Sequence, residues 1–217
     1  MIHAKNISKS FGSKKLFSDL DINLKKGNFL IIHGRNGVGK STLLKTLIGV
    51  ISSDSGTQDY LSNQSRNLSL GYVSTNASSF FNRLSVMENL TFFLQMRGFD
   101  KEQSIKKIRD TFKQLQIDSS MMDQKYMFLS SGERKKVSLI RCFAHEPYVI
   151  VMDEPLSGLD KQFKKLFLIY LSNICKKNNN ILILVSHNVD FYEGLYTHEL
   201  EMDDCSNSEI IIRNQLR

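Results

Sequence analysis

The sequence lacks the features that mark secreted, zinc-stapled and membrane-spanning proteins. Its three cysteines (Cys142, Cys175 and Cys205) are far apart and odd in number, so they form neither a disulfide framework nor a zinc-binding spacing. No apolar run approaches the ~18 residues that a membrane-spanning helix needs, and the N-terminus has no apolar signal core. We therefore expect a protein of the reducing cytosol, in which any membrane role depends on a partner.

The sequence also has no internal repeat, no linker and no dense block of one charge. The formal net charge of +7 comes from scattered basic residues, which favours a solvated surface over a nucleic-acid or anionic-membrane partner. Charged residues make up 24% of the chain and apolar residues 41%, as in globular proteins. The length of 217 residues predicts a single domain, residues 1–217.

The clearest motif lies between an apolar run at 29–32 and a helical apolar pattern at 43–48. It fits the P-loop pattern, and its members are Gly34, Arg35, Asn36, Gly37, Val38, Gly39, Lys40, Ser41 and Thr42. Glycines let backbone N–H groups approach phosphates, and the following helix N-terminus adds positive charge. Lys40 can reach the β- and γ-phosphates, and the Ser41 hydroxyl can ligate Mg²⁺. The motif therefore predicts a site for a nucleoside triphosphate with Mg²⁺.

A second motif is a pair of carboxylates, Asp153 and Glu154, directly after the apolar run at 148–152. Such a run is typical of a parallel strand buried on both faces, and open α/β sheets place their sites at the C-terminal ends of these strands. Asp153 can hold Mg²⁺ directly or through water, and Glu154 can accept a proton from an attacking water. The alternative is a solvent-facing acidic turn, but the P-loop on the same chain favours the functional interpretation.

Three further places are candidates for the same chemistry. Phe11 is expected in a loop ahead of the P-loop, where it can stack on a purine base, although a lone aromatic there is more often a core or hydrophobic-rim residue. His187 comes shortly after the apolar run at 181–185 and can hydrogen-bond a γ-phosphate, although a lone histidine there is ordinarily structural or solvated. Residues 129–136 form a serine-glycine turn that opens a helix, and Pro147 stops that helix.

The order of patterns predicts an α/β fold. We expect β structure over 1–32, the P-loop helix over 40–50, a turn at 53–56, and one or two strands within 57–73. Capping-box spacing at Ser85–Glu88 begins a helix, and the apolar face of Ile105, Ile108, Phe112 and Leu115 marks the next, so 76–143 is roughly a helical insertion. Residues 198–213 are expected to close the chain as a β-hairpin.

Taken in order, these motifs resemble the ATP-binding cassette (ABC) ATPases over essentially the whole chain. The resemblance rests on the P-loop, the insertion, Leu-Ser-x-Gly-Glu at 129–133, Asp-Glu-Pro at 153–155, Ser-Gly-Leu-Asp at 157–160 and Ser-His at 186–187. It implies a P-loop NTPase core with a mostly parallel sheet, an N-terminal antiparallel β subdomain and an inserted helical subdomain. It also implies that the chain binds and hydrolyses ATP with Mg²⁺.

The resemblance assigns a role to each motif. Residues 34–42 look like the Walker A loop, Asp153 like the Walker B magnesium residue, Glu154 like the catalytic base and His187 like the switch histidine. Phe11 takes the place of the aromatic residue that stacks on adenine. In this family two cassettes pack head to tail, and the signature of one caps the nucleotide of the other. The residues implied for that contact are Ser130, Gly132 and Glu133, with Asp160 at the dimer interface.

The sequence departs from the family pattern in two places, the signature and the segment after residues 72–74. Ser131 occupies the first glycine position of the signature, and Glu133 replaces the commonest glutamine. After residues 72–74 the family normally has a glutamine that touches Mg²⁺ and couples to the membrane subunit, whereas this chain has Thr75 and Asn76. Thr75 can still bond water or metal with a shorter reach, so it is a weak magnesium candidate.

We therefore expect an ATPase subunit that powers a membrane transporter from the inner face of the cell membrane. It would act as a homodimer or paired cassette with a separate transmembrane subunit. That subunit would dock on residues 75–100, where Phe80, Phe81 and Leu84 suit a partner groove, although each can instead pack under the helical insertion. The absence of an added C-terminal domain resembles export-type cassettes, including those that handle haem in cytochrome c maturation.

Two other functions stay open at this point. One is a soluble ATPase of the same family that remodels nucleic acid, a ribosome or an iron–sulfur assembly scaffold. The ribosome-acting relatives carry two cassettes and the DNA-acting ones long coiled coils, and the sequence has neither. The other is a nucleotide-gated binding module with little turnover, against which the intact Glu154 and His187 argue.

Overall fold

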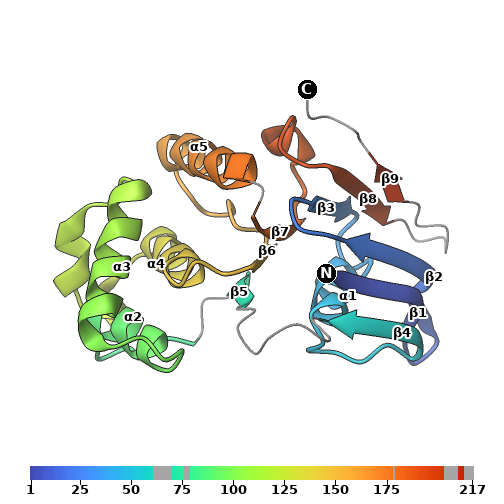
Figure 1. Cartoon of the computed structure of the whole chain (residues 1–217), viewed down its shortest axis with the longest axis horizontal. Helices are drawn as coiled ribbons and strands as arrows, with labels where there is room; N and C mark the ends of the chain where they lie inside the picture. The colour runs from blue at the N-terminus through green and yellow to red at the C-terminus, as the bar shows by residue number, and fades with distance from the viewer. Residues whose placement is uncertain (61–69, 76–78, 178, 203–209, 213–217) are drawn as a thin grey trace.

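The computed structural model describes residues 1–60, 70–75, 79–177, 179–202 and 210–212. Figure 1 shows an antiparallel sheet at one end, a central sheet, and a group of helices at the other end. Within the described residues, no helix has both the length and the apolar character needed to cross a bilayer. The arrangement confirms the predicted α/β fold class, with an N-terminal antiparallel part and an inserted helical part.

The antiparallel sheet has the strand order β2-β1-β4, formed by β1 (Ile2–Phe11), β2 (Lys14–Leu24) and β4 (Ser55–Tyr60). The prediction of a turn at 53–56 is wrong for its second half, because Ser55 and Gly56 belong to β4. Gly56 has a φ of +81°, and a Cβ built on it would lie 2.3 Å from the backbone oxygen of Asn6. Only glycine therefore allows β4 to approach β1 this closely.

The central sheet has the order β5-β6-β7-β3-β8-β9. Its first five strands in this order, including β3, are parallel, and β9 is antiparallel to β8. Its strands are β3 (Phe29–Gly34), β5 (Leu70–Val73), β6 (Val149–Asp153), β7 (Ile181–Val185), β8 (His198–Met202) and β9 (Ile210–Ile212). The pairing of β8 with β9 confirms the predicted closing hairpin, and its turn at 203–207 lies outside the described residues.

Alternate residues of β3, β6 and β7 enter two different cores. On β6, Val149 and Val151 pack with α1 (Lys40–Leu47) and the antiparallel sheet, whereas Ile150 and Met152 pack with the other helices. β6 and β7 are buried along their whole lengths. Burial on both faces explains why the sequence shows continuous apolar runs here, because neither face meets water.

The helices α2 (Val86–Gln95), α3 (Lys101–Gln114) and α4 (Ser131–Phe143) lie between β5 and β6 in the chain. Ser85 and Glu88 form the predicted capping box at the start of α2. Of the apolar face predicted for α3, Ile108, Phe112 and Leu115 are buried, whereas Ile105 is only partly buried. Helix α5 (Lys161–Lys177) covers the same face of the sheet as α4 (Figure 1).

Three 3₁₀ helices were not predicted: η1 (Ser119–Asp123), η2 (Tyr126–Phe128) and η3 (Val189–Tyr192). Each is at most five residues long, which is too short to show a helical apolar period.

Candidate functional site

The P-loop leaves β3 at the C-terminal edge of the central sheet and leads into α1. Three of its glycines have positive φ: Gly34 at +135°, Gly37 at +76° and Gly39 at +116°. A Cβ built on Gly34 would lie 2.0 Å from the backbone oxygen of Met202, so β8 leaves no room for a side chain there. A Cβ built on Gly37 would meet nothing within 4 Å. The loop therefore packs tightly against β8 at Gly34 and borders open space at Gly37, as a phosphate-binding loop requires.

Lys40 begins α1 and lies folded against the loop. It is 6% exposed, and its Nζ donates hydrogen bonds of 2.8 Å to the backbone oxygens of Gly34 and Arg35. Burial lowers the pKa of Lys40, and the negative charges of Glu154 and Asp153 oppose that shift. The structure thus brings the P-loop lysine close to the carboxylate pair that the sequence placed more than a hundred residues away.

Asp153 is the last residue of β6, and Glu154 follows it directly. Asp153 is 5% exposed and pairs with Val185 of β7. Glu154 has a φ of +49°, a left-handed conformation that costs energy for a residue with a Cβ. Its backbone N–H donates to the oxygen of Val185 at 3.0 Å, which helps to hold this conformation.

The side chain of Glu154 faces the histidine that follows β7. Its Oε1 lies 3.5 Å from Nε2 of His187, and the imidazole is 41% exposed while the carboxylate is 20% exposed. Burial raises the pKa of Glu154, and His187 opposes this rise. A carboxylate with a raised pKa is a stronger base, so this group is suited to accept a proton from water.

The residues of this edge fit Mg²⁺ that arrives with a triphosphate. Asp153 offers a buried carboxylate and Ser41, in the first turn of α1, offers a hydroxyl. In the part of the chain that the structure describes, no group of three His, Cys, Asp or Glu side chains could hold a metal alone. Mg²⁺ suits such a site because it binds through few protein oxygens and keeps water and phosphate ligands. Thr75 is exposed in a bend after β5, and Asn76 lies outside the described residues.

Phe11 is the last residue of β1, so its predicted place in a loop is wrong. Its side chain is 55% exposed, so it is not a core residue. The Nζ of Lys9 lies 5.6 Å from the centroid of its ring. Across the hairpin, Lys14 donates a hydrogen bond of 2.9 Å to the backbone oxygen of Gly37. Sequence reasoning missed Lys14, because only the β1–β2 pairing shows that the start of β2 reaches the P-loop.

The serine-glycine turn caps α4. Ser130 is the N-cap residue, and Glu133 Oε2 accepts hydrogen bonds from its hydroxyl at 2.7 Å and from its backbone N–H at 2.8 Å. These bonds lower the pKa of Glu133. A Cβ built on Gly132 would lie 3.3 Å from the oxygen of Gly158, and Lys136 pairs with Asp160 at 3.1 Å. Figure 1 places α4 among the helices, apart from α1, so this turn is not at the P-loop of its own chain.

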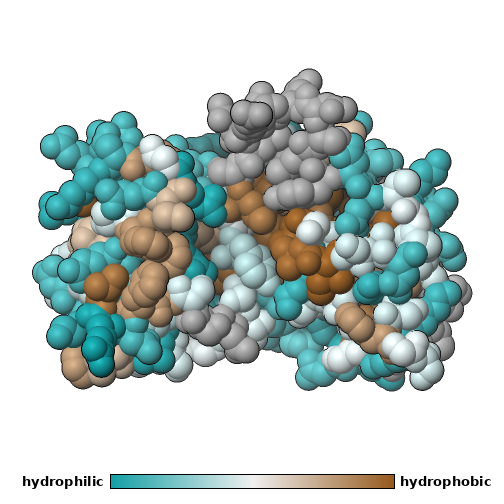
Figure 2. All heavy atoms as spheres, turned by 90° about the horizontal axis from the view of Figure 1, so that it is seen from below, coloured by the Kyte–Doolittle hydropathy of each residue, from teal (hydrophilic) through white to brown (hydrophobic). Residues whose placement is uncertain are grey.

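The helical part carries an exposed apolar surface, which we call the aromatic patch. Its members are Phe81, Phe92, Met96, Met127 and Phe128, which are 40–73% exposed. Figure 2 shows apolar side chains gathered on the helical part of the molecule. The expectation of exposure is confirmed for Phe81 and wrong for Phe80, which is 8% exposed and stacks on Tyr126 at 4.6 Å. Leu84 is half-buried.

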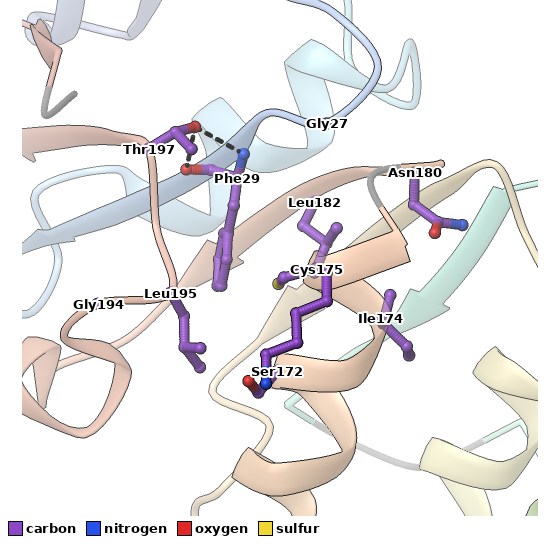
Figure 3. Close-up of a pocket in the computed structure, with 11 residues that line it drawn as sticks. Gly27, Phe29, Ser172, Ile174, Cys175, Asn180, Leu182, Gly194, Leu195 and Thr197 are labelled. Carbon is purple, nitrogen blue, oxygen red and sulfur yellow. Dashed lines mark hydrogen bonds between the residues drawn. The ribbon is translucent and has the colours of Figure 1, made fainter. Parts of the chain in front are cut away.

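A small cavity of about 100 Å³ lies under α5, lined by Phe29, Cys175 and Leu195 among others (Figure 3). Phe29 begins β3, whereas the P-loop follows the other end of that strand, so the cavity is separate from the edge described above. Burial raises the pKa of Cys175 to about 11 and that of Cys142 to about 12. Neither thiol is therefore suited to act as a nucleophile, and Cys205 lies outside the described residues.

Comparisons with known proteins point in one direction. A family model described as "ABC transporter" matches residues 17–157. The ergothioneine transport ATP-binding protein EgtV of Helicobacter pylori (strain G27) is 30% identical over 207 residues, which cover 93% of this chain and 97% of the relative. A probable sulfate/thiosulfate import ATP-binding protein CysA of Chlorella vulgaris is 32% identical over 196 residues, covering 88% of this chain and 81% of the relative.

Solved structures agree with these sequence matches at the level of the fold. The cassette MJ0796 has been solved as a dimer and also as a dimer in a post-hydrolysis state bound to ADP and phosphate. The post-hydrolysis structure has a TM-score of 0.86 and 19% identity to this chain, and each chain is covered completely.

Proposed function

The chain belongs to the ABC transporter family, in which it is an ATP-hydrolysing subunit, and we propose that the residues around Lys40 and Glu154 carry out its chemistry. The observation that carries this proposal is the meeting of the P-loop lysine, the carboxylate pair and His187 at one edge of the sheet. Three segments far apart in the sequence supply them, each at the end of a parallel strand, where α/β sheets bind ligands.

Nucleotide binding is assigned to the P-loop and to Phe11. Backbone N–H groups of residues 34–42 surround the phosphates above Gly37, where the structure leaves space. Lys40 exchanges its bonds to backbone oxygens for bonds to the β- and γ-phosphates, since an ammonium group prefers charged acceptors. Phe11 stacks on the adenine, because its ring is exposed on the hairpin that Lys14 ties to the loop.

Hydrolysis is assigned to Glu154 and its neighbours. Glu154 accepts a proton from the water that attacks the γ-phosphate in line, and His187 orients the carboxylate and contacts the γ-phosphate. Ser41 and Asp153 hold Mg²⁺, which when bound neutralises charge on the phosphates. A positioned general base contributes about 10²–10⁴-fold in rate, which sets the loss expected when Glu154 is replaced.

Dimerisation completes the site in this proposal. The capped turn of Ser130, Gly132 and Glu133 lies away from the P-loop of its own chain, so a second cassette must supply it head to tail. A dimer is also the form in which the cassette MJ0796 has been solved. Because the Ser130 hydroxyl is bonded to Glu133 here, it must turn to reach the partner's γ-phosphate. Asp160 forms an ion pair with Lys136 in the same helix as this turn, and it would face the dimer interface.

The membrane subunit is proposed to dock on the aromatic patch, which places the chain at the inner face of the membrane. Solvent-exposed apolar surface of this kind marks partner sites, and the patch includes members of the 75–100 segment, Phe81 and Phe92. The Chlorella relative is named for import, so the comparisons give no support to an export-type cassette. We assign the direction of transport and the substrate to the membrane subunit.

The proposal is tested by phosphate release and by nucleotide titration on four proteins. The unmodified chain should hydrolyse Mg·ATP. Glu154→Gln should bind ATP with unchanged affinity and lose at least about 100-fold in turnover. Lys40→Ala should bind ATP much more weakly. Glu193→Gln, at an exposed position directly after η3, should behave as the unmodified chain. Undiminished turnover in Glu154→Gln would refute its role as the base.

A further inference from the structure

Helix α4 carries three consecutive cations, Arg134, Lys135 and Lys136, just beyond the capped turn. Lys136 pairs with Asp160 at the surface, and Arg134 donates to the backbone oxygen of Met127 at 3.0 Å. Lys135 differs from both because it is only 5% exposed. Lysine is almost never fully buried unless it is paired, so its position requires an explanation.

The side chain of Lys135 reaches the hydrolytic edge of the sheet. Its Nζ donates a hydrogen bond of 3.1 Å to the backbone oxygen of Ser74, the residue directly after β5. β5 and β6 run parallel with Val73 opposite Met152, and Ser74 and Asp153 are the residues that follow this pair in the two segments. Burial lowers the pKa of Lys135, and the charges of Asp153 and its neighbour Glu154 oppose that shift. The ammonium group therefore lies within electrostatic reach of both carboxylates.

Close packing of α4 on β5 makes this reach possible. A Cβ built on Gly71 of β5 would lie 2.7 Å from the backbone oxygen of Cys142 and 2.7 Å from Cγ of Pro147. The end of α4 and the loop after it thus press on β5 at a separation that only glycine permits. Because α4 lies this close to β5, the ammonium group of Lys135 can contact the residue that follows β5.

We propose that Lys135 is a positioning residue for hydrolysis, which ties the Ser74–Thr75 segment to α4 and holds a positive charge beside the carboxylate pair. The inference rests on the proposed function of this edge as the ATP site. Thr75 stands where a longer glutamine is usual in the family that the sequence resembles, and it is exposed in a bend. The Ser74–Thr75 segment is instead held by Lys135 of α4. Because the Ser130 turn begins the same helix, a shift of α4 would also move this segment at the C-terminal edge of the central sheet.

The test compares kcat and KM for Mg·ATP in three variants. Lys135→Met keeps the length of the side chain and removes the donor and the charge, so kcat should fall about tenfold or more while KM changes less than about twofold. Lys135→Arg should restore kcat to within about threefold, and Lys135→Gln should not, because only arginine keeps the charge. Lys106→Met, at an exposed position of α3, is the control and should leave both constants unchanged.

A kcat within twofold of the unmodified chain in Lys135→Met overturns the proposal. If Lys135→Met does not fold, the remaining pair decides, and equal activity of Lys135→Gln and Lys135→Arg overturns it. Hydrogen exchange of residues 70–75 without nucleotide gives a readout independent of turnover, and it should accelerate in Lys135→Met but not in Lys106→Met. If the unmodified chain shows no turnover, the proposed function fails instead, and unchanged exchange in Lys135→Met then refutes the tie to α4.

Discussion

Three glycines of positive φ allow stability and nucleotide binding to be separated by the same substitution. Gly34, Gly37 and Gly98 have φ values of +135°, +76° and +92°. Alanine at Gly98, between α2 and α3, and at Gly37, in the P-loop, would meet nothing within 4 Å. At both places the cost is only the left-handed backbone, about 1–2 kcal/mol. At Gly34 the new Cβ would also lie 2.0 Å from the oxygen of Met202.

The expected stabilities follow from these contacts. Gly37→Ala and Gly98→Ala should each lose about 1–2 kcal/mol of unfolding free energy in urea. Gly34→Ala should lose about 3 kcal/mol or more, because a backbone carbonyl cannot move aside as a flexible side chain can. Mg·ATP titration then separates the first two variants. Gly98→Ala should bind as the unmodified chain does, whereas Gly37→Ala should bind at least about tenfold more weakly, since its methyl group enters the space for phosphate.

The glycine series can contradict the reasoning in two ways. If Gly34→Ala is as stable as Gly98→Ala, the close packing of the P-loop on β8 does not restrain that glycine. If Gly37→Ala binds ATP with full affinity, the phosphates do not lie above Gly37.

Three other predictions follow from single contacts. Phe112→Ala, at a position 1% exposed in α3, should cost about 3–5 kcal/mol in urea unfolding, and a loss below 1 kcal/mol would contradict its place in the core. In a Cys205→Ser protein, Cys142 and Cys175 should react slowly with iodoacetamide at pH 7.5, because their pKa values are raised to about 12 and about 11. The rate should rise about tenfold for each pH unit above 7.5, as the thiolate fraction rises. A fast reaction at pH 7.5 would contradict the burial of these two thiols. Ser130→Ala should cost about 1 kcal/mol as a lost N-cap and abolish ATP-dependent dimers of Glu154→Gln in light scattering, and persistent dimers would refute the role of the turn in trans.

Segments whose pattern depends on their own residues were predictable. The apolar runs at 148–152 and 181–185 identify β6 and β7 because burial on both faces leaves no polar position. The Ser85–Glu88 capping box identifies the start of α2 because its hydrogen bonds join residues only three apart.

Features that depend on contacts between distant residues were not predictable. Gly56 looked like a turn residue, but it lies in β4 because β1 passes within contact distance of its backbone. Phe80 looked exposed, but η2 provides Tyr126 for it to stack on. The structure brings together Lys40 and the carboxylate pair as the motifs indicate, whereas Lys14 and Lys135 join the edge only through the packing of β2 and α4.

The central claim is that the chain powers a membrane transporter, and the most direct measurement is what it binds in its own cells. The Glu154→Gln protein would be trapped with ATP, crosslinked and solubilised, and its partners identified by mass. A matched protein with Phe92→Asp and Phe128→Asp in the exposed aromatic patch serves as the control. A polytopic membrane protein should be captured by the first protein and lost from the second. Recovery of only soluble proteins or nucleic acid would contradict it and favour an ATPase that remodels a soluble partner.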